Sequence, residues 1–163
     1  MSNDRFGMRW GLAGGTTLAT VDQARQAAAF ATRANFDSFW ISHARGVDPI
    51  LALACIADDV AGLKEVGTSV TPLYGRHPVG LAQLARSAQT VLGGKFTLGV
   101  GASTKGQAEG ALGLSRDRPI SFARESIDAL YSWVSGAPPD VPAATISDHG
   151  DHPTNAARPP VPA

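Results

Sequence analysis

Residues 65–100 read EVGTSVTPLYGRHPVGLAQLARSAQTVLGGKFTLGV. The first part, Glu65 to Thr71, is rich in β-branched residues and predicts a strand. His77-Pro78 then places proline at the start of a helix, where its missing N–H costs nothing. Gly93-Gly94 ends that helix, and Lys95 to Val100 predicts a second strand. A strand, a helix and a strand joined by short links are typical of a parallel sheet.

The helix inside this segment shows apolar residues at helical spacing. They are Leu81, Leu84, Ala85, Ala88 and Leu92. We therefore expect this set to form the face that packs on the sheet.

The same alternation continues toward the N-terminus. Phe36 to Ser42 predicts a strand, and the helix after it begins at Asp48-Pro49, a cap followed by proline. Met8 to Ala13 predicts an earlier strand. The helix that follows begins at Thr20, with Gln23 at the spacing of a capping box.

On the C-terminal side, a long glycine-rich loop from Gly101 to Arg118 precedes a fourth helix, which begins near Pro119 and ends at Gly136. We expect six apolar residues on its inner face: Ile120, Ala123, Ile127, Leu130, Tyr131 and Val134. Residues 8–135 thus predict four parallel strands in sequential order, each followed by a helix.

The composition changes after residue 136. Seven prolines fall within residues 137–163, and neither helical nor strand periodicity survives there. Such a segment buries too little apolar area to offset its chain entropy. We therefore predict a folded unit over residues 1–136 and a disordered Pro/Ala-rich tail over residues 137–163.

Bulk properties exclude several classes of function. Basic and acidic residues balance at 14 each, so no charge pattern indicates nucleic-acid binding. No apolar run has the roughly 18 residues of a membrane span, and no targeting signal is visible. The lone cysteine, Cys55, is predicted to be a buried thiol, and its isolation fits a reducing cytoplasm.

Five segments resemble the luciferase-like family of oxidoreductases, especially its branch that uses coenzyme F-420. They are Phe36 to Ile41, Val66 to Pro72, Arg76-His77-Pro78, Gly94 to Gly101 and Gly113 to Pro119. The resemblance covers residues 8–135, in order and at consistent spacing. It implies an α/β fold that is part of a TIM (β/α)8 barrel, with about four of the eight β/α units present.

The resemblance also implies a function. The chain would transfer a hydride between coenzyme F-420 and an organic substrate, and flavin mononucleotide (FMN) is the alternative coenzyme because the family also contains FMN-dependent monooxygenases. A whole barrel of this type needs about 250 residues. Four strands cannot close, and their open edges favour self-association.

Candidate site residues lie where the strands end, because long loops after the strands carry the chemistry of β/α folds. This working face should hold Gly14, His43, Thr71 and Gly101. His43 follows the second strand and can exchange protons near neutral pH. The resemblance places a catalytic residue there.

The predicted coenzyme-binding residues come from the third and fourth strands. The resemblance implies a non-proline cis peptide near Ser69–Val70 that presses on the back of the coenzyme ring. The residues of the third strand are Gly67, Thr68, Ser69 and Val70, and those of the fourth are Gly99, Gly101 and Ser103. Glycine and other small residues let a ligand approach the backbone.

Other interpretations remain open. The chain could be an inactive half-barrel that self-associates, or an unrelated doubly wound nucleotide binder. Gly99 and Gly101 do not form a dinucleotide fingerprint, because the third glycine and the immediate helix are missing. His149 and His152 lie in the tail without a rigid frame, so we predict no metal site there.

Overall fold

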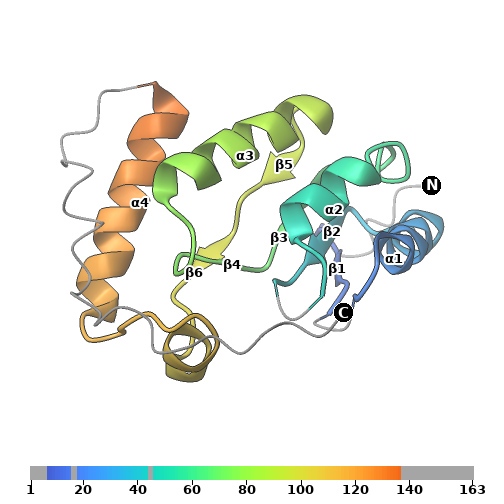
Figure 1. Ribbon diagram of the computed structural model, residues 1–163. Coiled ribbons are helices and arrows are strands. Elements are labelled where there is room, and N and C mark those ends of the chain that lie inside the picture. Colours follow the sequence, from blue (N-terminus) through green and yellow to red (C-terminus); the bar gives the residue numbers. More distant parts are fainter. Residues whose placement is uncertain (1–6, 16–17, 44–45, 137–163) are drawn as a thin grey trace, which may run out of the picture.

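The computed structural model describes residues 7–15, 18–43 and 46–136. Strands and helices alternate along the chain (Figure 1). The elements are β1 (Gly11–Ala13), α1 (Val21–Arg33), β2 (Ser38–Ile41), α2 (Pro49–Cys55), β3 (Glu65–Thr68), β4 (Thr71–Pro72), α3 (Pro78–Val91), β5 (Phe96–Thr97), β6 (Val100–Gly101), the π-helix η1 (Gly106–Ala111) and α4 (Pro119–Ser135).

The main sheet has four parallel strands in the order β1-β2-β3-β5. Its register aligns one residue from each strand: Leu12, Phe39, Val66 and Phe96. Each strand of this sheet pairs with the strand of the next β/α unit, as in a TIM barrel. The predicted order and direction of the strands are therefore confirmed.

The third and fourth predicted strands each divide in two. Residues beyond Thr68 and Thr97 leave the main sheet, and β4 then pairs with β6 in a separate parallel pair. The Ser69–Val70 peptide lies between β3 and β4 and is cis, which confirms the feature that the resemblance implied.

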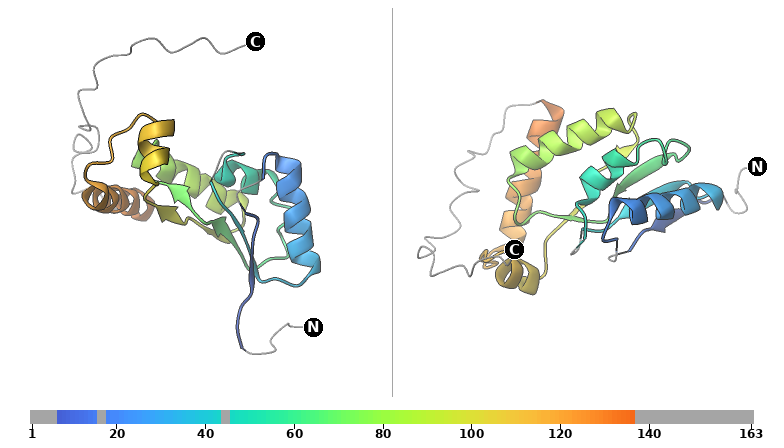
Figure 2. Two further views of the ribbon diagram at one scale, coloured as in Figure 1. Left: turned by 90° about the horizontal axis from the view of Figure 1, so that it is seen from below. Right: turned by 45° about the vertical axis from the view of Figure 1, so that its right-hand side comes forward.

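Helices α1, α2 and α3 lie side by side on one face of the sheet (Figures 1 and 2). Side chains that point to this face, such as Phe39, Ile41 and Val66, are almost wholly buried against them. Trp40 and Thr97 alternate with them and lie on the opposite face, where they stay partly or fully exposed. Within the described ranges no helix covers that second face.

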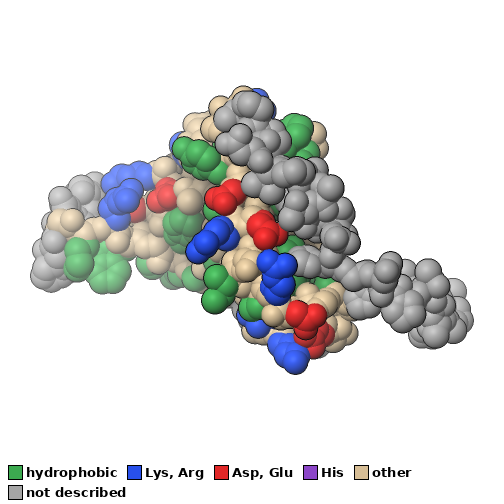
Figure 3. Space-filling view, turned by 90° about the vertical axis from the view of Figure 1, so that its left-hand side faces the viewer, with side chains coloured by type: hydrophobic (Ala, Val, Ile, Leu, Met, Phe, Trp, Pro, Cys, Tyr) green, Lys and Arg blue, Asp and Glu red, His purple; other side chains and the backbone are tan. Residues whose placement is uncertain are grey.

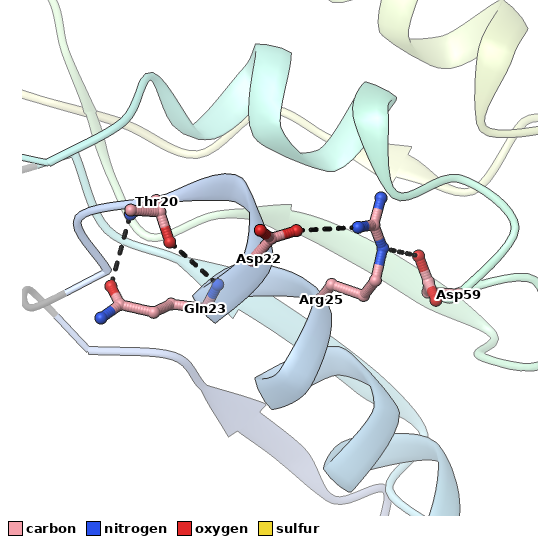
Figure 4. Close-up of polar contacts among 5 residues, drawn as sticks. All are labelled: Thr20, Asp22, Gln23, Arg25 and Asp59. Carbon is pink, nitrogen blue, oxygen red and sulfur yellow. Dashed lines mark hydrogen bonds and ion pairs between the residues drawn. The ribbon is translucent and has the colours of Figure 1, made fainter.

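The first helix begins as the sequence predicts. The Thr20 hydroxyl accepts a hydrogen bond from the Gln23 N–H at 3.2 Å, and the Gln23 side chain accepts from the backbone N–H of Ala19 and Thr20. One turn on, Arg25 binds both Asp22 and Asp59 (Figure 4). The second of these ion pairs ties α1 to the turns after α2.

The prediction for the fourth helix was wrong about its inner face. Phe122, Ser126 and Ala129 are the buried residues of α4. Four of the six expected residues are exposed instead: Ile120, Ile127, Tyr131 and Val134. In Figure 3, which faces α4, hydrophobic side chains are interspersed with charged ones and do not form one patch.

The apolar side of α4 nevertheless borders a groove. Ile127, Tyr131 and Val134 line it together with residues of α3 and with Phe96, Leu98 and Val100. The groove has a volume of about 600 Å³. It lies beside β5, which is an edge strand among the described residues.

Three smaller expectations also fail. Cys55 is exposed, because it is the last residue of α2 and faces away from the sheet. Leu84 is exposed on α3. The loop predicted over residues 101–118 contains the π-helix η1, whose Ala108 packs with Leu73, Tyr74 and Phe122 in a second small core.

No helix within the described residues is long and apolar enough to span a membrane. The predicted disordered tail, with His149 and His152, lies outside the described residues.

Candidate functional site

The ends of β2 and β3 are joined by three hydrogen bonds just past the sheet. Ser69 N–H donates to the Ile41 carbonyl at 2.9 Å, and the Ser42 hydroxyl donates to the Ser69 carbonyl at 2.7 Å. His43 N–H donates to the Val70 carbonyl at 3.2 Å. The backbone of His43 is therefore held directly beside the Ser69–Val70 peptide.

Two glycines approach the same peptide from the other side. A Cβ atom on Gly101 would lie 2.8 Å from Cγ2 of Val70, and one on Gly99 would lie 2.0 Å from the Thr68 carbonyl oxygen. Thr71 N–H donates to the Gly99 carbonyl at 2.8 Å and holds this approach in place. A side chain at position 99 would need a backbone shift, whereas one at position 101 would push against the side chain of Val70.

The predicted coenzyme-binding residues divide into two layers. Ser69 and Val70 are exposed, and the Val70 side chain keeps 45% of its surface open although it is apolar. Gly67 and Thr68 are buried beneath them. Gly67 makes room for the Trp40 ring, and the Thr68 hydroxyl binds both the N–H and the carbonyl of Gly99.

Ser103 is held at the start of the loop that leads to η1. Its carbonyl accepts a hydrogen bond from Arg116 Nε at 2.7 Å. Its hydroxyl is buried and has no hydrogen-bond partner among the described residues, and the same holds for the hydroxyl of Thr71. The structure thus brings Val70, Gly99 and Gly101 together at one surface, with Thr71 below it.

His43 lies in a charged environment that comes from three segments. Its Nδ1 atom is 3.9 Å from Oδ2 of Asp48, and Asp48 forms an ion pair with Arg76. Burial lowers the pKa of His43 below its ordinary value, the Arg76 cation lowers it further, and the Asp48 carboxylate opposes both. The imidazole is therefore predominantly neutral near neutral pH.

Opposing effects also act on the pKa of Asp48. Burial raises the pKa of this carboxyl group, but the Leu51 N–H and Arg76 outweigh burial and leave the pKa of Asp48 below its ordinary value. Its Oδ1 atom accepts the Leu51 N–H at 2.9 Å and caps α2. One carboxylate thus caps a helix, binds an arginine and faces the histidine.

Sequence reasoning did not assign Asp48 or Arg76 to the site. Asp48 was interpreted only as a helix cap, and Arg76 only as part of the start of the next helix. Their positions in the sequence could have indicated the site, because Asp48 and Arg76 both lie in loops that follow strand ends on the working face. Strand ends of neighbouring parallel strands meet at one edge of the sheet, so charged residues there are neighbours.

The Val70 side chain forms a small apolar surface at the ends of the strands. Gly99 and Gly101 have no side chains beside it, so this surface is of the kind that a flat ring can cover. His43 adjoins it, and its buried Nδ1 has no hydrogen-bond partner among the described residues. No cluster of three or more metal-binding side chains occurs in the described part of the chain.

The sequence matches a known protein family. The family model described as luciferase-like monooxygenase matches residues 7–163. A 5,10-methylenetetrahydromethanopterin reductase of Methanolobus tindarius is 30% identical over 110 residues, which is 67% of this chain and 33% of that protein. The chain spans about a third of the length of the curated relatives it matches.

Solved structures show the same fold. The coenzyme F-420-dependent tetrahydromethanopterin reductase of Methanopyrus kandleri superposes with a TM-score of 0.69 at 19% identity, covering 82% of this chain and 42% of that one. The oxygenating constituent of 3,6-diketocamphane monooxygenase from Pseudomonas putida, in complex with FMN, gives a TM-score of 0.63 at 24% identity. This superposition covers 74% of this chain and 37% of the monooxygenase chain.

Proposed function

Because the chain belongs to the luciferase-like monooxygenase family, we propose that its folded part binds the ring of a flavin or deazaflavin coenzyme against Val70. The function would be hydride transfer between that coenzyme and an organic substrate. One observation carries the proposal. Val70 is an apolar side chain left half open at the strand ends, with His43 on one side and Gly101 on the other.

The coenzyme would supply the redox chemistry, and the protein would supply orientation and proton handling. Val70 would support one face of the ring. Gly99 and Gly101 would let the ring approach the backbone, because no side chain stands in the way. His43, whose pKa is lowered, would accept a proton at its imidazole.

We favour coenzyme F-420 over FMN. The segments that resemble the family are most similar to its F-420 branch, and the relatives include reductases of the methanopterin type. The FMN-bound monooxygenase of the same fold supports the alternative. A titration with each coenzyme, followed by fluorescence, distinguishes them through the two dissociation constants.

A second candidate function is an inactive half-barrel that self-associates. Within the described residues, β1 and β5 are edge strands with a free side. The described part of each copy contributes a main sheet of four parallel strands with both edges, so two copies would supply the eight strands of a closed barrel. The exposed apolar side of α4, next to β5, favours this pairing because a partner strand would cover it.

The test of the coenzyme site is the substitution Val70→Asp. A carboxylate at this position would place a charge against the ring face, and we expect binding of coenzyme F-420 to weaken at least tenfold. The matched control is Val91→Asp, which places the same charge on an exposed valine at the far end of α3. Equal affinity of the wild type and both variants would contradict the proposed site.

A further inference from the structure

Asp48 lies between Arg76 and His43 but contacts only Arg76 closely. Arg76 binds Oδ2 of Asp48 directly, whereas Nδ1 of His43 stays 3.9 Å from the same oxygen. That distance is too long for a hydrogen bond. The His43 Nδ1 atom is buried and has no hydrogen-bond partner in the described part of the chain.

The three side chains are held by different elements. Asp48 is fixed at the start of α2 by its hydrogen bond to Leu51 N–H. Arg76 lies just before α3, and His43 is fixed by its own N–H on the Val70 carbonyl. The Asp48 and Arg76 side chains are each about a quarter exposed, so water screens their charges only partly.

We propose that Asp48 and Arg76 are a positioning pair for His43, in which Arg76 occupies the carboxylate and so keeps the imidazole neutral. Without the arginine, the same carboxylate oxygen would accept the Nδ1–H of His43 and stabilise the imidazolium. The pair thus sets the protonation state of the residue that the proposed function uses as proton acceptor. The catalytic consequence rests on the proposed function, but the protonation state does not.

The charged groups that face His43 among the described residues are these two. Arg76 lowers the pKa of His43 and Asp48 raises it, in addition to the effect of burial. The two variants should therefore move the pKa of His43 in opposite directions. A merely structural role predicts the same direction for both, because loosening the site exposes the imidazole and returns the pKa toward its ordinary value of 6.5.

The experiment is an NMR titration of labelled histidines in the full chain without coenzyme. The chain has four histidines, and the signal of His43 is assigned as the one lost in His43→Gln. The variants are Arg76→Gln, Arg76→Lys and Asp48→Asn. Asparagine keeps an oxygen that can cap α2, so the last variant removes the charge and preserves the helix start.

We expect the pKa of His43 to rise in Arg76→Gln, because a cation beside the imidazole is removed, and to return near the wild-type value in Arg76→Lys. It should fall in Asp48→Asn. A rise in both Arg76→Gln and Asp48→Asn, or no change in either, would overturn the proposal. Coenzyme is absent from this measurement, so failure of the coenzyme titration with Val70→Asp leaves its outcome untouched, and the reverse also holds.

Discussion

At Gly99, two backbone segments approach more closely than any side chain allows. A Cβ atom there would lie 2.0 Å from the Thr68 carbonyl oxygen, and that oxygen belongs to a buried strand that cannot move aside. We therefore expect Gly99→Ala to lower the free energy of unfolding by about 2–3 kcal/mol, the cost of overpacking. Urea denaturation measures this value.

Gly80 provides the matched control for that substitution. It lies in the first turn of α3, and a Cβ atom there meets nothing within 4 Å. Gly80→Ala should raise the free energy of unfolding by roughly 0.5–1 kcal/mol, because alanine is the better helix residue. If Gly99→Ala and Gly80→Ala changed the free energy of unfolding equally, Gly99 would not be packed as the structure shows.

The residues of the site were only partly predictable. His43, Val70 and Gly101 were expected on one surface, because each ends a strand or follows one and parallel strands end at the same edge. The ion pair of Asp48 and Arg76 was not, because it joins residues 28 positions apart whose local patterns indicate helix starts. Contacts between side chains of different elements depend on tertiary packing, which local patterns do not report.

Among the elements, α1 offers the clearest test of a local rule. Its capping box was predicted from Thr20 and Gln23 alone and is present in the structure (Figure 4). Thr20→Ala removes the oxygen that accepts the Gln23 N–H, and we expect it to lower the free energy of unfolding by about 1 kcal/mol. Thr20→Ser keeps that oxygen and should lie within a few tenths of wild type. If Thr20→Ser lowered the free energy of unfolding as much as Thr20→Ala does, the methyl group of Thr20 would matter more than the capping hydrogen bond.

The fourth helix shows where periodicity misleads. Apolar residues at helical spacing predict burial, but α4 has two apolar sides, and only the side of Phe122 and Ala129 is buried among the described residues. Phe122 stacks on Tyr74 with ring centroids 4.2 Å apart and anchors the packed side. The other side, with Ile127 and Tyr131, borders the groove beside β5. Periodicity identifies an apolar face and does not say which protein segment covers it.

For the whole molecule, this incomplete packing predicts self-association. We expect the chain to form dimers or larger species, detected by light scattering coupled to size-exclusion chromatography. Ile127→Glu, within the groove, should increase the monomer fraction. Ile120→Glu is the matched control, because Ile120 is 77% exposed on the same helix but does not line the groove. A wild type that stays monomeric at high concentration would contradict this expectation.

The openness of the proposed coenzyme site predicts weak turnover. Val70 is exposed, and β1 and β5 are edge strands among the described residues, so a ring bound there stays accessible to water, which weakens electrostatic stabilisation. We expect little or no reduction of coenzyme F-420 by a panel of small organic hydride donors. Robust turnover by a monomer would contradict this expectation.

The location of the coenzyme is the central claim, and NMR mapping of backbone amides tests it most directly. On addition of coenzyme F-420 to the isotopically labelled chain, the account predicts saturable shifts at His43, Val70 and Gly101, where the strands end. The groove between α3 and α4 is the competing cavity, and Arg86, Leu130 and Tyr131 report on it. Shifts confined to those three residues, or no shifts at any coenzyme concentration, would contradict the account.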